Sequence, residues 1–128
     1  MKRGVRPMEE RVLISLLLDF YGALLTERQR QCLSWHHEDD MSLAEIAETL
    51  GVSRQAVHDN MQRARQLLDM YESKLHLVTQ YEKREHLLSH LKTELSKLDD
   101  VFHVAHNQVE QVTQYKNSLY ELVAQMEG

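Results

Sequence analysis

Polar side chains that could recognise a nucleic acid are concentrated in one short stretch, residues 54–65. Within it, Val57, Met61 and Ala64 recur at helical spacing, so the residues between them point away from the apolar side of a helix. Arginine and glutamine on such an outward face have the hydrogen-bonding groups that contact base edges and phosphates. The predicted nucleic-acid-binding residues are Arg54, Gln55, His58, Asp59, Gln62, Arg63 and Arg65.

A helix-turn-helix pattern is expected to position these side chains. Ser42 and Glu45 form the signature of a capping box, and Gly51 suits the left-handed conformation that ends a helix. Ser53 then caps the second helix, which carries the polar stretch. The first helix has an apolar face formed by Leu43, Ile46, Ala47 and Leu50. Two helices joined by a glycine-containing turn are typical of DNA-binding motifs, and the alternative is an ordinary helical hairpin with a solvated outer face.

The charge balance predicts weak binding by a single copy. The chain has a formal net charge of −5, and residues 26–76 hold nine acidic and six basic side chains, a net charge of −3. The basic character is local, because Arg54, Arg63 and Arg65 against Asp59 leave residues 54–65 at +2. Neutralising phosphates supplies much of the affinity for nucleic acid, so tight binding would need a dimer or a partner.

The composition argues against several other classes of protein. Only 4 glycines and 1 proline interrupt 128 residues, which predicts an all-α chain. The sequence has no glycine-rich phosphate loop, catalytic carboxylate pair or nucleophile–base spacing, so we expect no enzyme, cofactor or metal site. The single cysteine, Cys32, cannot form an internal disulfide, which indicates a reducing, cytoplasmic compartment. The apolar run from Val12 to Leu18 is shorter than the roughly 20 residues of a membrane-spanning helix.

The chain is expected to divide into a helix-turn-helix domain over residues 1–76 and a long helical extension over residues 77–128. In the first part, a helix is expected over residues 8–24, with an inward face formed by Val12, Leu13, Leu16, Leu17 and Phe20. A second capping box at Thr26 and Gln29 predicts the start of the next helix, which ends near the acidic residues 38–40.

The extension has a heptad pattern. After Ser53 no glycine or proline appears before Gly128, so the second helix of the motif is expected to continue directly into the extension. Apolar residues in the extension recur at alternating steps of three and four, a spacing that is typical of coiled coils. The predicted dimerisation residues are Leu88, Leu91, Leu95, Leu98, Phe102, Val109, Val112 and Leu119. Either a straight coiled coil forms a homodimer, or Asp99 and Asp100 cap a new helix that folds back as an intramolecular hairpin; we expect a homodimer or higher homo-oligomer in both cases.

Three strings of residues resemble the YlxM family of helix-turn-helix proteins. They are Leu-Leu-Leu-Asp-Phe-Tyr at 16–21, Asp-Asp-Met-Ser-Leu-Ala-Glu-Ile-Ala-Glu at 39–48 and Val-Ser-Arg-Gln-Ala-Val-His-Asp-Asn at 52–60. The resemblance covers about half of the chain. It implies a fold similar to the promoter-reading fourth region of bacterial sigma factors, and an association with the signal recognition particle. Where sigma-like readers carry basic and amide side chains, this chain has His58 and Asp59, which argues against specific promoter reading.

Three functions are compatible with this sequence. The first is a non-enzymatic regulatory protein of the signal recognition particle pathway that binds RNA, DNA or proteins of the particle. The second is a dimeric DNA-binding transcriptional regulator that uses the polar face of residues 54–65. The third is a protein-interaction module that does not bind nucleic acid. The acidic net charge favours the first and third, whereas the intact motif favours the second.

Overall fold

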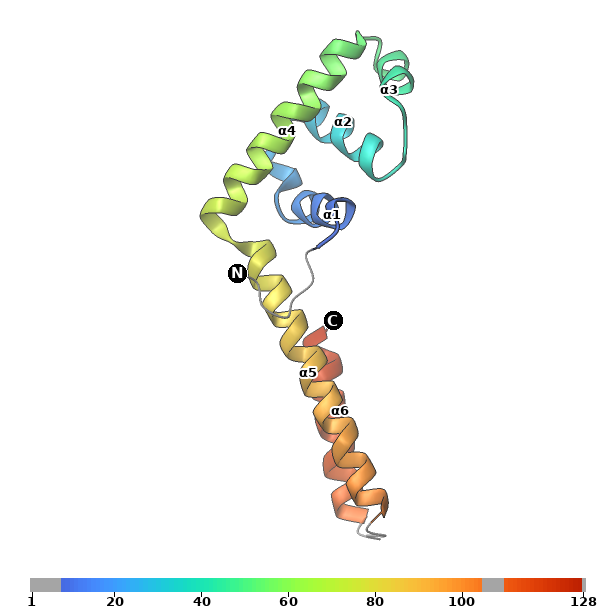
Figure 1. The fold of residues 1–128 in the computed structure, drawn as a ribbon, viewed down its shortest axis with the longest axis vertical. Coiled ribbons are helices and arrows are strands. Elements are labelled where there is room, and N and C mark those ends of the chain that lie inside the picture. The colour runs from blue at the N-terminus through green and yellow to red at the C-terminus, as the bar shows by residue number, and fades with distance from the viewer. Residues whose placement is uncertain (1–7, 105–109, 128) are drawn as a thin grey trace. The chain divides into compact units, whose positions relative to one another are not determined.

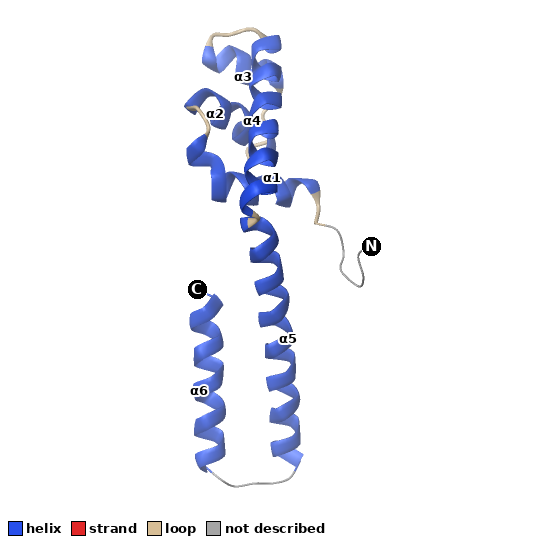
Figure 2. Cartoon of the chain, turned by 90° about the vertical axis from the view of Figure 1, so that its left-hand side faces the viewer, coloured by secondary structure: helices blue, strands red, loops and turns tan. Residues whose placement is uncertain are grey.

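The computed structural model of the chain describes residues 8–104 and 110–127 (Figure 1). These residues form six α-helices and one 3₁₀ turn, and no strand occurs among them (Figure 2). They fall into two compact units, a helix-turn-helix unit (Met1–Val78) and a hairpin unit (Thr79–Gly128). The predicted all-α fold, a small helix-turn-helix domain with a helical extension, is confirmed.

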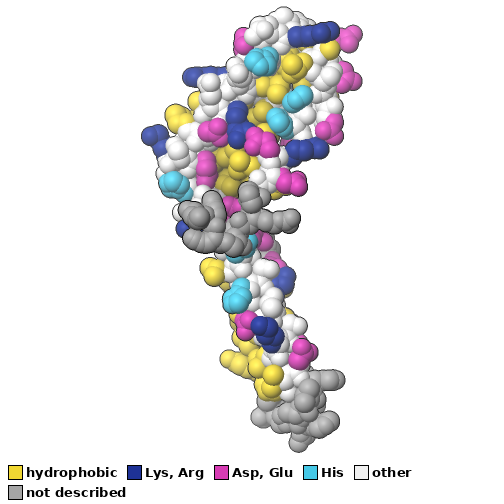
Figure 3. Space-filling model, in the orientation of Figure 1, with side chains coloured by type: hydrophobic (Ala, Val, Ile, Leu, Met, Phe, Trp, Pro, Cys, Tyr) yellow, Lys and Arg dark blue, Asp and Glu magenta, His cyan; other side chains and the backbone are white. Residues whose placement is uncertain are grey.

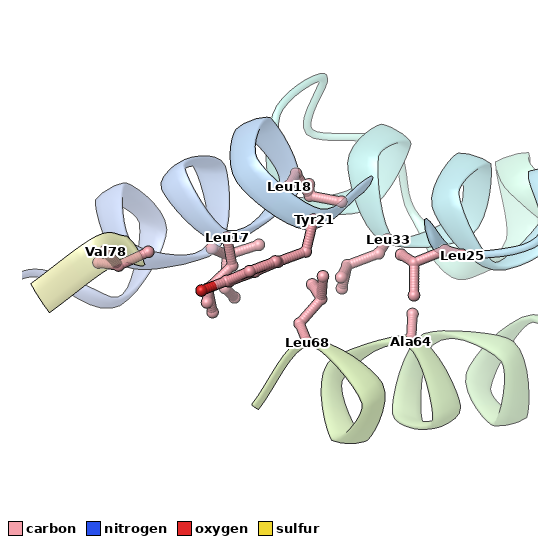
Figure 4. Packing of buried hydrophobic residues seen from close by; sticks show 9 residues of the cluster. Leu17, Leu18, Tyr21, Leu25, Leu33, Ala64, Leu68 and Val78 are labelled. Atoms are coloured by element: carbon pink, nitrogen blue, oxygen red, sulfur yellow. The ribbon is translucent and has the colours of Figure 1, made fainter. Parts of the chain in front are cut away.

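The first core of the helix-turn-helix unit joins α1 (Glu10–Tyr21), α2 (Glu27–His37) and α4 (Arg54–Leu75). Figure 4 shows side chains from these helices and from Val78 converging on one another. The buried cluster consists of Ile14, Leu17, Leu18, Tyr21, Leu25, Leu33, Ala64, Leu68 and Val78. Apolar residues from four segments of the chain therefore share one core, which fixes α4 against α1 and α2.

The predicted inward face of α1 was partly wrong. Val12 and Phe20 are exposed, whereas Ile14, Leu18 and Tyr21 are buried beside Leu17. The helix also ends at Tyr21 and is followed by the 3₁₀ turn η1 (Gly22–Leu24). The error has a physical reason, because residues 12–21 are almost entirely apolar and both candidate faces fit helical spacing equally well.

The second core lies under the helix-turn-helix motif. Cys32 of α2 packs with Ile46 and Ala47 of α3 (Leu43–Leu50) and with Val57 of α4. Trp35 is half-buried against this cluster and is therefore a packing residue. The capping box predicted for α2 is present, since Thr26 Oγ1 accepts from the Gln29 amide at 3.2 Å and the Gln29 side chain accepts from the Thr26 amide at 3.0 Å.

The predicted continuous helix from Ser53 into the extension was wrong. The α4 helix ends at Leu75, His76 adopts the left-handed conformation (φ 56°), and α5 (Leu77–Val104) begins directly afterwards. The Tyr21 hydroxyl accepts a hydrogen bond from the Leu77 amide (3.1 Å) and donates one to Glu72 Oε1 (2.7 Å). Glu72 Oε1 also accepts from the Val78 amide (3.0 Å), so the amides at the start of α5 find partners outside the helix.

In the hairpin unit, α5 and α6 (Glu110–Glu127) run side by side in opposite directions (Figure 2). Leu88, Leu95 and Val123 form their buried core. Lys92 Nζ lies 2.6 Å from Glu127 Oε2 and Lys116 Nζ lies 2.6 Å from Asp99 Oδ1, and both ion pairs join α5 to α6. Of the two predicted alternatives, the straight coiled coil and the intramolecular hairpin, the structure has the hairpin.

Asp99 and Asp100 do not cap the returning helix, as the hairpin alternative had supposed. Both lie inside α5, and Asp99 accepts a hydrogen bond from the Tyr120 hydroxyl at 3.0 Å in addition to its ion pair with Lys116. Lys116 is half-buried, and its pairing with Asp99 across the hairpin explains why a charged residue is tolerated there.

The predicted dimerisation residues take up different positions in the hairpin. Leu88 and Leu95 are buried within one chain, Leu91 and Leu98 remain exposed, and Phe102 and Leu119 are half-buried. Val109 and the side chain of Val112 lie outside the described residues. The hairpin therefore uses only part of the heptad pattern, and dimerisation stays a prediction.

Candidate nucleic-acid interface

The first helix of the motif, α3, begins and ends as its sequence predicts. Ser42 Oγ accepts from the Glu45 amide (3.1 Å), and Glu45 Oε1 accepts from the Ser42 amide (2.8 Å), which completes the capping box. Gly51 follows the helix with φ 70° and ψ 35°, and its amide donates to the carbonyls of Ala47 and Glu48. Hydrogen bonds therefore fix both ends of α3, and those at Gly51 also fix the turn.

The turn leads directly into α4. The Val52 amide donates to the Ala47 carbonyl at 3.0 Å, and Ser53 Oγ accepts from the Ala56 amide at 3.0 Å as the cap of α4. Val57 and Ala64 are fully buried beneath this helix. Because these two residues anchor one side of α4, the opposite side of its first three turns must face solvent.

The exposed side of α4 contains a small polar network around Asp59. The Gln55 side chain donates from Nε2 to Asp59 Oδ1 at 2.9 Å, and His58 Nδ1 lies 3.8 Å from the same oxygen. All three side chains are exposed. In this conformation the Asp59 carboxylate binds the Gln55 amide and lies beside the His58 imidazole, two groups that were predicted to bind nucleic acid.

Arg65 is more strongly engaged than the other predicted residues. Its Nε donates to Asp69 Oδ1 at 3.0 Å, and its Nη1 forms an ion pair with Glu10 of α1. The hydrogen bond from Arg65 lowers the pKa of the Glu10 carboxyl below its ordinary value. Arg65 thus joins α4 to α1, and a phosphate would have to compete with two carboxylates for it.

Arg54, Gln62 and Arg63 differ from these residues. All three are exposed, and none makes a side-chain hydrogen bond or ion pair with the described part of the chain. Of the seven predicted residues, these are the ones whose polar groups are available without breaking an internal pair. Whether the seven residues bind nucleic acid stays a prediction.

Sequence reasoning did not include Glu10 or His37 in this region. Glu10 is 55 positions from Arg65, and no local pattern links them. A hollow of about 170 Å³ opens beside Arg65 between α1, α2 and α4. It is lined by Ile14, Leu33, His37, His58, Met61, Gln62 and Arg65. Burial, followed by the neighbouring His36, lowers the pKa of His37, which favours a neutral imidazole at the edge of this hollow.

The surface around the motif mixes both signs of charge. On the face shown in Figure 3, Lys and Arg side chains alternate with Asp and Glu, and histidines border an apolar strip. In the described ranges no group of three or more His, Cys, Asp or Glu side chains is placed to hold a metal ion. Among the helices of residues 8–104 and 110–127, none is long and apolar enough to cross a membrane.

The fold, the glycine turn and the exposed first turns of α4 define a helix-turn-helix protein. The chain belongs to the UPF0122 family, described as "Putative helix-turn-helix protein, YlxM / p13 like", whose model matches residues 8–108. A UPF0122 protein of Exiguobacterium sp. strain AT1b is 49% identical over 88 residues, which cover 69% of this chain and 82% of the relative.

Two further relatives show the same extent of similarity. A UPF0122 protein of Halalkalibacterium halodurans is 46% identical over 90 residues, covering 70% of this chain and 83% of the relative. One of Listeria welshimeri is 46% identical over 84 residues, covering 66% and 76%. The family match includes the whole motif and α5, whereas α6 lies beyond it.

Proposed function

We propose that this protein is a non-enzymatic regulatory protein that binds nucleic acid through the exposed face of α4. The observation that carries the proposal is the motif itself. Val57 and Ala64 anchor α4 to the core, while Arg54, Gln62 and Arg63 are exposed and have no side-chain partner among the described residues. This is the arrangement in which a recognition helix presents its first turns to a groove.

The positions of these side chains suggest different roles. Gln62 lines the hollow, whereas Arg54 is exposed in the first turn of α4. Both are proposed to reach base edges, with Gln55 and His58 joining them when they leave Asp59. Arg63 lies farther round the helix and is proposed to contact a phosphate. With few phosphate contacts per copy, affinity should be modest and should fall by roughly tenfold between about 50 and 200 mM salt.

Two nucleic acids are suitable ligands for the test. Mixed-sequence duplex DNA represents the usual ligand of a helix-turn-helix protein. The resemblance to the YlxM family supports signal recognition particle RNA as the second, since it links the family to that pathway. The acidic residues around the motif repel the phosphates of both ligands, so binding to either should be weak at physiological salt.

The experiment measures fluorescence anisotropy of both labelled ligands with the full chain at the two salt concentrations. Arg54→Ala and Arg63→Ala should each weaken binding by about fivefold or more. Arg84→Ala, which removes the same charge from an exposed position on α5, is the matched control and should leave affinity within about twofold. Asp59→Asn should strengthen binding by about threefold, because it removes a charge of the same sign as the phosphates from the face.

The outcomes separate the candidate functions. Preferential binding to the particle RNA would support a role in that pathway, and preferential binding to duplex DNA would support a transcriptional regulator. No binding to either ligand at the lower salt would overturn the proposal and leave a protein-interaction module.

A further inference from the structure

The hairpin unit buries much less of its apolar surface than the helix-turn-helix unit. Of the 16 buried apolar residues in the described part of the chain, 13 lie in the helix-turn-helix unit and only Leu88, Leu95 and Val123 lie in the hairpin unit. Two helices alone have one contact line between them, so their remaining faces stay open. The hairpin therefore needs a further layer to bury its apolar residues.

One uncovered apolar stripe runs along α5. Leu87, Leu91, Leu98 and Val101 are 37–69% exposed and follow one another at steps of four, seven and three residues, which places them on one side of the helix. Glu94 falls within this stripe, and its carboxylate is paired with Lys97 Nζ at 3.2 Å. The stripe thus has little uncompensated charge.

A second stripe runs along α6. Tyr115, Leu122 and Met126 are 53–69% exposed and follow at steps of seven and four residues. None of these positions is charged, and Leu119, which is half-buried, adjoins them. The exposed large side chains of this stripe are therefore apolar from Tyr115 to Met126.

Both stripes lie on the same side of the hairpin. An exposed residue follows a buried one by three positions on each helix: Leu91 after Leu88, Leu98 after Leu95, and Met126 after Val123. A step of three residues turns back by about 60° on either helix. Because α5 and α6 are antiparallel, the same rotation from their contact leads to the same side. Figure 3 shows apolar side chains gathered along one side of this unit.

We propose that this face, formed by Leu87, Leu91, Leu98, Val101, Tyr115, Leu122 and Met126, binds the same face of a second copy, so that two hairpins form a four-helix bundle. Each partner contributes about 800 Å² to a standard interface. The proposed face has seven large apolar side chains, each 37–69% exposed, on two helices of 28 and 18 residues. It is therefore comparable in size to one partner's side of such an interface.

A second copy fits this face better than a charged partner. A two-fold dimer pairs one surface with itself, and homodimer interfaces are more apolar than interfaces between proteins that also exist alone. The face meets both conditions, because its residues are apolar and its single acidic side chain is already paired within the chain. Two stacked hairpins would form a four-helix bundle in which every helix packs on two neighbours.

The test is the mass of the full chain in solution without nucleic acid, measured by light scattering after gel filtration. The wild type should have twice the 15.1 kDa of one chain. Leu91→Glu combined with Leu122→Glu should give the mass of one chain with unchanged helical circular dichroism, since both residues are exposed within a copy. Val12→Glu combined with Leu24→Glu changes two similarly exposed residues of the helix-turn-helix unit and should leave the dimer intact.

A mixture of two oppositely charged variants tests the face directly. Leu91→Lys combined with Leu122→Lys should also be monomeric, and mixing it with the glutamate variant should restore a dimer that contains both variants. A wild type that remains monomeric, or a glutamate variant that remains dimeric, would overturn the proposal. This readout is independent of nucleic-acid binding, so it can fail or succeed whatever the outcome for α4.

Discussion

The two units of this protein bury their apolar residues in different ways. In the helix-turn-helix unit, helices from four parts of the sequence surround two adjoining cores, and residues such as Leu17 and Leu68 are completely inaccessible to solvent. In the hairpin unit, two helices meet along one line, and residues such as Leu87 remain largely exposed. The first unit can position a functional face by itself, whereas the second has an open face that calls for a partner.

The largest effect on stability is expected from truncating a buried core residue, which we compare between the two units. Leu17→Ala should lower the free energy of unfolding by about 3–5 kcal/mol, because Leu17 is enclosed by three helices and its cavity cannot collapse. Leu95→Ala in the hairpin should cost less, about 2 kcal/mol, because fewer neighbours surround it. Urea unfolding monitored by circular dichroism measures both. Equal losses would contradict the difference that we describe between the units.

The turn of the motif provides the next test. Gly51→Ala should destabilise the helix-turn-helix unit by about 1–2 kcal/mol, because φ of 70° strains any residue with a Cβ atom. A Cβ at Gly51 would meet no atom within 4 Å, so the loss would come from the backbone alone. Gly51→Asn should cost less, since asparagine tolerates this conformation better than alanine. If asparagine and alanine were equally harmful, backbone strain would not be the cause.

At the junction between α4 and α5, a substitution that introduces glycine should not lower the stability, in contrast to the loss expected on removing Gly51. His76 adopts a left-handed conformation (φ 56°) without being a glycine. His76→Gly should therefore be neutral or stabilising by up to about 1 kcal/mol, since relief of strain exceeds the added flexibility of the unfolded chain. Lys74→Gly, inside the last turn of α4, is the matched control and should destabilise by about 1 kcal/mol. Thermal unfolding of the two variants would reveal the difference in sign.

The smallest effect is expected from the contact between α1 and α4. The Arg65 hydrogen bond lowers the pKa of Glu10 in the folded state, so the pair stabilises the fold above the ordinary glutamate pKa. This contribution is lost as the pH falls through the lowered value. Glu10→Gln should cost a few tenths of a kcal/mol at neutral pH, because Glu10 is exposed, and progressively less as the pH falls below the ordinary glutamate pKa. Glu9→Gln, at the neighbouring exposed position, removes the same charge outside the Arg65 pair and is the matched control.

Local sequence signals predicted the motif well. The capping boxes at Thr26 and Ser42, the turn at Gly51 and the cap at Ser53 all appear in the structure where the sequence places them. These features depend on side chains that satisfy backbone groups within three or four residues, so their spacing can be recognised directly in the sequence.

Apolar patterns that fit two packing arrangements equally well were less informative. The apolar run of α1 fits two inward faces, and only packing against α2 and α4 selects the one that contains Ile14 and Tyr21. The heptad pattern of the extension likewise fits a straight coiled coil and a hairpin. The Lys116–Asp99 and Lys92–Glu127 pairs accompany the second solution.

The sequence by itself therefore determined the all-α class, the limits of the motif and the outward position of its polar residues, because these follow from helical periodicity and local capping. The tertiary structure decided where α4 ends and which polar groups are already engaged. Tyr21 and Glu72 bind the first amides of α5, and Glu10 binds Arg65. Tyr21 and Glu10 lie more than 50 residues from these partners, and contacts of that range form only when α1 packs against α4.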